Sequence, residues 1–127
     1  MNGVKKMVGV ELIAAERASQ IERKGLDAGY TYNELVFAAV CYASPVQLYV
    51  KRGTPTSLYF GDPWPVSWGD NWDKRPTDMS GRPKVQTDEQ RLRQLVKAGA
   101  LIAAEIDRLQ RYVAENAARL EMKTLSR

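Results

Sequence analysis

The chain of 127 residues contains no histidine and only one cysteine, Cys41. Without histidine there is no Ser-His-Asp triad, no Cys-His pair, no two-histidine zinc helix and no imidazole general base. Catalysis would have to rest on carboxylates, lysine, tyrosine or a bound metal. A magnesium site held by carboxylates is the one common enzymatic design left, because magnesium needs little more than hard oxygen ligands.

Long apolar runs are also absent. No run approaches the roughly 20 residues of a membrane-spanning helix, and the N-terminus lacks the apolar core of a signal peptide. A single cysteine cannot form an internal disulfide, which agrees with a reducing compartment. These observations predict a soluble, cytoplasmic protein with no membrane partner.

Charge of either sign is spread along the chain. There are 19 basic and 15 acidic side chains, a net charge of +4 and a pI near 9.3. This balance favours partners that bear phosphate, but the absence of a basic tail does not favour duplex DNA. The length suits a single domain with its own core and is too short for two domains.

The clearest pattern is a long C-terminal helix, predicted over residues 87–122. Thr87 followed by Gln90 is typical of a capping box and marks its start. At ~1.5 Å per residue the helix would be roughly 50 Å long, more than a small domain can cover, so we expect a second copy of the chain to cover part of it. Gly99 should mark a close helix crossing. Apolar or small residues recur at steps of three and four, at Leu92, Leu95, Gly99, Ile102, Ile106, Leu109, Val113 and Leu120.

Residues 8–43 are predicted to form two further helices. The first runs from Val8 to Lys24 and ends at Gly25, a residue favoured at helix C-caps. Thr31 and Glu34 resemble a second capping box in front of an almost wholly apolar helix, which a Ser-Pro pair at 44–45 ends. We expect this second helix to lie at the centre of the core.

Residues 44–86 differ in composition and hold all three tryptophans. The runs 46–50 and 57–60 predict the two strands of a hairpin, with residues 51–56 as its turn. Residues 61–76 are too rich in proline and glycine for regular structure and too aromatic for disorder, so an ordered loop is predicted. The expected fold class is therefore α-rich (α+β), with a helical core, one long C-terminal helix, a small hairpin and a Trp/Pro-rich loop.

The tryptophan loop is the first candidate site. The indoles of Trp64, Trp68 and Trp72 can stack on nucleobases, while Lys74 and Arg75 can meet phosphate. The alternative is that the tryptophans pack on the helices as a second small core.

Arginines on the helices form the second candidate site. Arg108 and Arg111 are three residues apart on one helix face, a spacing that can hold a phosphodiester, and Arg17 allows the same interpretation. The alternative is an ion pair on the helix surface, because Glu105 lies three residues before Arg108.

Carboxylates of the three helices are the third candidate, as magnesium ligands for nucleotide hydrolysis. Their spacing does not favour this role, because Glu11 and Glu16 are five residues apart and point in different directions. We therefore predict no catalytic residue, no metal site and no cofactor. Magnesium enters only with the hydrolase alternative, which would use Glu34, Glu105 and neighbouring carboxylates.

Several blocks of the sequence together resemble a widespread family of small, mostly uncharacterised bacteriophage and prophage proteins. The blocks are 11–17, 20–22 with 25, 34–35 with 38–39 and 41–43, 64–65, and 95–109, of which 97–109 is the most specific. Many family members carry a stretch rich in histidine and aspartate before the second helix, and residues 27–33 lack those histidines. The helical layout is loosely similar to the all-α nucleotide pyrophosphohydrolases, whose Glu-x-x-Glu and Glu-x-x-Asp motifs are not reproduced here.

A phage protein of this size is also similar to the sponges that sequester nucleotide immune signals, such as those acting against Thoeris or CBASS defence. This resemblance implies non-enzymatic sequestration of a cyclic-nucleotide or ADP-ribose-type signal in the cytoplasm of an infected bacterial host. We expect a homo-oligomer built on the long helix. The alternatives are a magnesium-dependent nucleotide pyrophosphohydrolase and a helical module that binds a host protein. The expected ligand-binding residues are Arg17, Trp64, Trp68, Trp72, Arg75, Arg108 and Arg111.

Overall fold

The computed structural model describes residues 6–24, 33–68, 72–79, 81 and 84–126. The described elements are α1 (Gly9–Lys24), α2 (Glu34–Ala43), β1 (Val50–Thr54), β2 (Ser57–Gly61) and α3 (Asp88–Leu125). The α-rich α+β class, the long C-terminal helix and the hairpin are thus confirmed. Among the described helices, none combines the length and the apolar character needed to cross a membrane.

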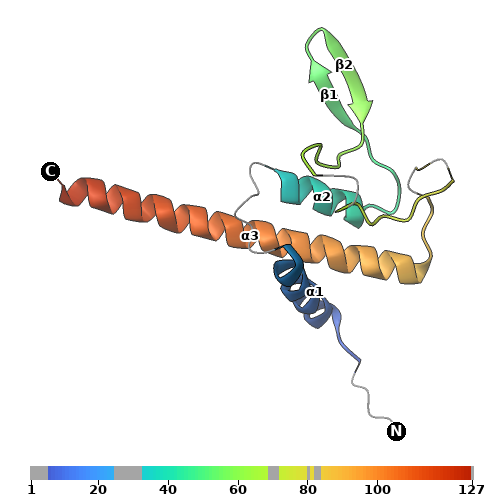
Figure 1. Cartoon of the computed structure of the whole chain (residues 1–127), viewed down its shortest axis with the longest axis horizontal. Coiled ribbons are helices and arrows are strands. Elements are labelled where there is room, and N and C mark those ends of the chain that lie inside the picture. Colours follow the sequence, from blue (N-terminus) through green and yellow to red (C-terminus); the bar gives the residue numbers. More distant parts are fainter. Residues whose placement is uncertain (1–5, 25–32, 69–71, 80, 82–83, 127) are drawn as a thin grey trace.

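Helix α3 is the longest element and organises the others. Its predicted capping box is present: the Thr87 side chain accepts from the backbone N–H of Gln90, and the Gln90 side chain accepts from the backbone N–H of Thr87. At ~1.5 Å per residue its 38 residues span about 57 Å. Figure 1 shows α2 and α1 against the N-terminal half of α3, while the C-terminal half projects past both.

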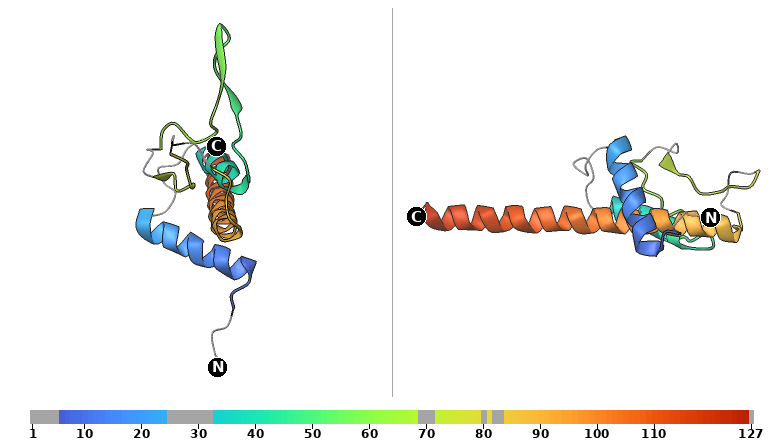
Figure 2. Two further views of the ribbon diagram at one scale, coloured as in Figure 1. Left: turned by 90° about the vertical axis from the view of Figure 1, so that its right-hand side faces the viewer. Right: turned by 90° about the horizontal axis from the view of Figure 1, so that it is seen from below.

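Helix α1 crosses α3 at Gly99, as the sequence predicted. A Cβ atom at Gly99 would lie 2.6 Å from Cδ1 of Ile13 and 2.8 Å from its Cγ1, so any larger residue would push the Ile13 side chain aside. Arg17 donates two hydrogen bonds to Oδ2 of Asp107, at 3.2 and 3.0 Å, and fixes the crossing beyond that point. Both views in Figure 2 show α1 running across α3 and not along it.

Helix α2 lies along the first half of α3 in the opposite direction. Its buried face packs on small residues of α3, such as Ala98 and Ala104, which let the two helices approach closely. Arg91, at the start of α3, donates to the backbone oxygens of Tyr42, Ala43 and Ser44 and so closes the C-terminus of α2.

The predicted start of α2 is wrong. Its N-cap is Asn33, which makes no side-chain capping bond, so Glu34 is the first helical residue and not the third. Gly25 and Thr31, named as cap residues from the sequence, lie outside the described residues. The expected central position holds for one face of α2 only. Three apolar side chains on its other face remain 36–38 % exposed, namely Val36, Phe37 and Val40.

The hairpin exists, but the prediction of its first strand is wrong. Val50 pairs with Gly61 and Thr54 with Ser57, so the connecting loop is only two residues, Pro55 and Thr56. Because β2 ends at Gly61, residues 46–49 have no strand to pair with. Gly53 takes a φ of 98°, and a Cβ there would collide with the backbone oxygen of Ser57. Glycine and the preset φ of proline therefore let the strands extend through residues predicted as turn.

Candidate functional site

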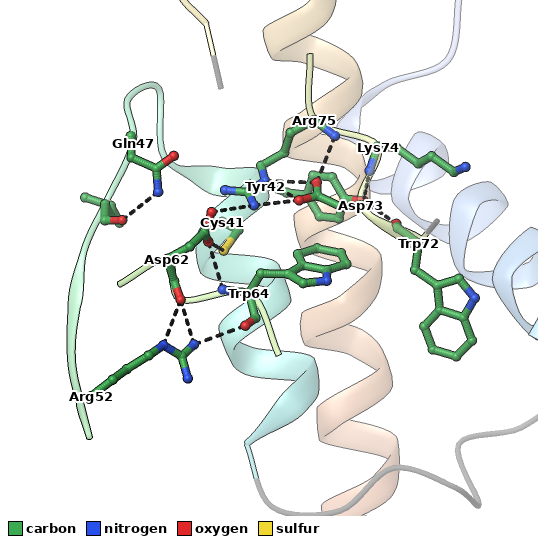
Figure 3. A network of polar contacts seen from close by, with 11 residues as sticks. Cys41, Tyr42, Gln47, Arg52, Asp62, Trp64, Trp72, Asp73, Lys74 and Arg75 are labelled. Atoms are coloured by element: carbon green, nitrogen blue, oxygen red, sulfur yellow. Dashed lines mark hydrogen bonds and ion pairs between the residues drawn. The ribbon is translucent and has the colours of Figure 1, made fainter. Parts of the chain in front are cut away.

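A buried arginine joins the segments on both sides of the tryptophans. Arg75 is only 9 % exposed. Its guanidinium donates to Asp62 Oδ2 at 2.9 Å and to Asp73 Oδ2 at 2.6 Å. The same guanidinium lies 5.6 Å from the centroid of the Trp64 ring, within range of a cation–π contact. Figure 3 shows this cluster over the C-terminal end of α2.

Two tight turns bring the carboxylates to Arg75. Asp62 Oδ1 accepts from the backbone N–H of Trp64 at 2.9 Å, and Asp73 Oδ1 accepts from the backbone N–H of Arg75 at 3.1 Å. In both turns an aspartate bonds the backbone two residues further on, as in an Asx-turn. Arg52 of β1 donates to the backbone oxygens of Asp62 and Trp64, and so ties the hairpin to the cluster.

The charge of the cluster is stable near neutral pH. Burial raises the pKa of Asp62, but the hydrogen bonds from Arg75 and from the Trp64 backbone outweigh burial, so the net pKa lies below 3.8. Burial lowers the pKa of Arg75, and its bonds to Asp73 and Asp62 more than restore it, so the net shift is upward. The cluster is therefore a closed ionic unit, which leaves Arg75 a poor candidate for phosphate.

Two weak acids beside the cluster stay protonated. Burial is the main cause that raises the pKa of Cys41 to about 12, although Arg75 lowers it in part. Burial likewise raises the pKa of Tyr42 to about 12. The Tyr42 hydroxyl donates to the backbone oxygen of Trp72 at 3.1 Å and accepts from the backbone N–H of Lys74 at 2.9 Å. Neither the Cys41 thiol nor the Tyr42 hydroxyl is therefore a nucleophile at neutral pH. The role of Tyr42 is to hold the backbone of Trp72 and Lys74 by hydrogen bonds.

The tryptophans form a row of edge-to-face contacts. Tyr42 and Trp64 are 5.7 Å apart between ring centroids, Trp64 and Trp68 5.5 Å, and Trp68 and Trp72 5.3 Å. Trp64 and Trp68 are 8 % and 6 % exposed and belong to the core cluster, whereas Trp72 is 37 % exposed. The core alternative thus describes Trp64 and Trp68, and Trp72 alone offers a ring surface. Residues 69–71 lie outside the described residues, so the loop as a whole stays a prediction.

The three arginines on the helices lie apart from the Arg75 cluster in the sequence and have their own partners. Arg17 pairs with Asp107. Arg108 pairs with Glu105, its Nε 2.6 Å from Oε1 and its Nη2 3.1 Å from Oε2, as the ion-pair alternative predicted. Arg111 is exposed on α3. The structure therefore brings Arg75 to the tryptophans and gives Arg17 and Arg108 to carboxylates.

A small cavity of about 120 Å³ lies beside the cluster. Ligand sites for drug-sized molecules are typically 300–1,000 Å³, so this cavity is too small for a whole nucleotide. It is lined by Cys41, Ser44, Pro45, Val46, Gln47, Arg75, Lys84, Val85 and Gln86.

The second notable surface is the uncovered face of α3, here called the open seam. Its members occupy the a and d positions of one heptad pattern and are 45–65 % exposed. Between them, Gly99 takes an a position and Asn116 a d position. A shallow groove of about 420 Å³ follows the projecting part, lined mostly by apolar side chains. The open seam consists of Leu92, Leu95, Ile102, Ile106, Leu109, Val113 and Leu120.

The magnesium alternative gains no support from the positions of its carboxylates. Glu105 is bonded to Arg108, and Glu34 accepts from the hydroxyl of Ser67. Across the described residues, no three cysteine or acidic side chains come together as a metal-holding group.

Comparisons with known proteins identify no relative. No family model matches the chain, and neither a curated protein nor a solved structure is similar to it. The resemblance to phage proteins therefore stays a prediction.

Sequence reasoning missed the residues that build the cluster. Asp62, Asp73 and Tyr42 were not singled out, although Asp62 and Asp73 each stand two residues before a backbone N–H that they bond. The available signal was the spacing: in a proline-rich segment, each aspartate stands two residues before a tryptophan or an arginine, which is typical of an Asx-turn. Tyr42 gave no such signal, because its partners lie about 30 residues away in the chain.

Proposed function

We propose that this protein is a non-enzymatic binding protein that works as a homo-oligomer built on α3. The observation that carries the proposal is the open seam, a heptad pattern of large apolar side chains that remain 45–65 % exposed. In proteins, helices owe most of their stability to the packing of an apolar face. The projecting half of α3 has such a face and, within one copy, nothing to pack it on.

The exposed area supports the same proposal. A compact protein of 14.3 kDa exposes about 6,800 Å², whereas this chain exposes 9385 Å². Figure 1 shows that the projecting half of α3 and the hairpin stand apart from the rest of the molecule.

Sedimentation velocity over a range of protein concentrations tests the proposal. We expect wild type to sediment as an oligomer and Leu109→Glu as a monomer, because the substitution places a carboxylate in the middle of the seam. Ala118→Glu is the matched control, since it adds the same charge on the exposed outer face of α3. A monomeric wild type at every concentration would contradict the proposal, and so would equal effects of the two substitutions.

A nucleotide-type ligand is the second candidate function, and the position of Trp72 favours it. Trp72 ends the row of tryptophans with a partly exposed ring, and Lys74, two residues away, is exposed and positively charged. A base stacked on an indole contributes about 1–3 kcal/mol, and a lysine nearby adds attraction for phosphate. Sequestration of a phage-defence signal would use this surface.

Isothermal titration with ATP, ADP-ribose and a cyclic dinucleotide tests the second candidate. Trp72→Ala should weaken binding by about 1–3 kcal/mol, and Lys74→Ala should weaken it more at low than at high salt. Met79→Ala, a fully exposed change in the same part of the chain, serves as the control. If none of the three probes binds, or if Trp72→Ala leaves their affinity unchanged, the nucleotide proposal is lost.

A further inference from the structure

We infer that two copies of the chain pair antiparallel along the open seam, so that the projecting half of each α3 lies on the N-terminal half of its partner. The inference rests on the proposed self-association and adds its direction and register. An antiparallel pair has two-fold symmetry and closes without leaving a further seam exposed.

Charges at the two ends of the seam favour the antiparallel direction. Asp88 and Lys123 both occupy d positions, at the start and at the end of the heptad pattern, and both are exposed. In a parallel pair each would face its own copy, because equal positions meet. In the antiparallel pair Lys123 of one copy lies about one helical turn from Asp88 of the other, so an attraction between opposite charges replaces the two like-charge contacts.

The position of the helical body favours the same direction. Helices α1 and α2 both pack on residues of α3 that precede Arg108, and all buried residues of α3 lie between Gln94 and Glu105. A parallel pair would bring both bodies to the same level along the axis. Figure 1 shows α1 and α2 beside one half of α3, so an antiparallel pair places these bodies at opposite ends, where each projecting half can lie along the partner's body.

The seam itself selects the register. When Ile102 lies opposite Val113 of the other copy, Leu95 meets Leu120 and Ile106 meets Leu109, so large apolar side chains face each other in every layer but two. In these two layers Asn116, the polar residue of the seam, lies opposite Gly99, beside the Ile13 side chain of α1, and Lys123 lies opposite Leu92. A shift of one heptad in one direction places Ile106 against Asn116 and Gly99 against Lys123. The opposite shift places Leu120 against Asp88.

Disulfide trapping with introduced cysteines tests the direction and the register. Two single variants, Ile102→Cys and Val113→Cys, are oxidised separately and as a mixture. In the antiparallel register each residue lies about 16 Å along the axis from its own counterpart, too far for a disulfide. We therefore expect a covalent dimer only in the mixture. Wild type is the control, because Cys41 is buried with its pKa raised to about 12 and should not form a bridge.

The results of this cross-linking test the antiparallel pairing separately from the proposed self-association. Covalent dimers of each single variant alone would show a parallel pair and overturn the inference, while self-association would stand. A bridge between Leu120→Cys and Ile102→Cys in place of the expected one would overturn the register. If sedimentation shows wild type to be monomeric, the proposed function itself fails and no specific bridge is expected.

Discussion

Residues 91–105 and residues 106–125 belong to one helix and share one heptad pattern, but they differ in what surrounds them. The first stretch carries alanines where α1 and α2 approach, and it contains every buried residue of α3. The second stretch carries large apolar side chains on one face and charges elsewhere, and from Leu109 onward all of its residues but Asn116 are exposed. Small residues thus mark contacts within the copy, and large exposed ones mark the contact that we propose between copies.

The largest expected effect comes from the ionic cluster beside the packed half. Arg75→Met leaves Asp62 and Asp73 buried in part without their cation, and breaking a buried pair in this way costs about 3–5 kcal/mol. We expect the lower end, because the Asp62 side chain is 37 % exposed. Arg119→Met on the projecting half is the control and should change the free energy of unfolding by less than about 0.5 kcal/mol. Urea denaturation measures the free energy of unfolding of both variants. An equal loss in the two variants would contradict the claim that the two regions differ in packing.

A matched pair of leucines compares the two halves directly. Leu101→Ala removes a buried side chain between α2 and α3 and should cost about 2–5 kcal/mol at any protein concentration. Leu109→Ala removes a half-exposed side chain and should cost less than about 1 kcal/mol in the dilute, monomeric chain. At high concentration its cost should grow, because the oligomer is weakened. Thermal unfolding at several concentrations checks this, and an equally strong concentration dependence for Leu101→Ala would contradict it.

The helix crossing gives a smaller effect. Gly99→Ala improves helix propensity by about 1 kcal/mol, but its methyl group collides with Ile13, and such overpacking costs about 1–3 kcal/mol. We expect a net loss of about 1 kcal/mol in the free energy of unfolding. The double variant Gly99→Ala/Ile13→Val removes the nearest methyl and should recover most of it. A Gly99→Ala protein more stable than wild type would show that α1 does not pack closely on α3.

The smallest effect concerns pH. Because the pKa of Asp62 is lower in the folded chain than its usual value of 3.8, ionised Asp62 stabilises the fold above that pH. The stabilisation is lost as the pH falls through the lower folded pKa. Asp62→Asn should therefore show a weaker loss of stability with acid than wild type, as followed by denaturant unfolding at several pH values. Identical acid slopes would contradict the assignment of the Arg75 cluster.

The sequence was sufficient where the pattern was periodic. The seam residues, the capping box at Thr87 and the crossing at Gly99 all follow from spacing or from a single residue with a strong local preference. The first hairpin strand was misplaced because β-propensity at residues 46–49 says nothing about which backbone lies opposite. Pairing with β2 decides that, and pairing is not local.

The cluster at Arg75 was out of reach for another reason. Its members come from the end of α2, from the residues after β2 and from the segment before α3, so they meet only when the chain is folded. The tryptophans were singled out from the sequence, but their number alone did not tell which of them is buried. The two hydrogen bonds of the Tyr42 hydroxyl hold the backbone of Trp72 and Lys74 in place, and Trp72 lies at the end of the row of tryptophans.

Hydrogen exchange of the α3 amides at low and high protein concentration tests the central claim most directly. We expect amides of residues 92–105 to be protected at both concentrations, since α1 and α2 pack on that half. Amides of residues 108–122 should exchange fast when dilute and become protected as the protein associates. If their exchange does not depend on concentration, a second copy does not cover the seam and the proposed assembly is wrong.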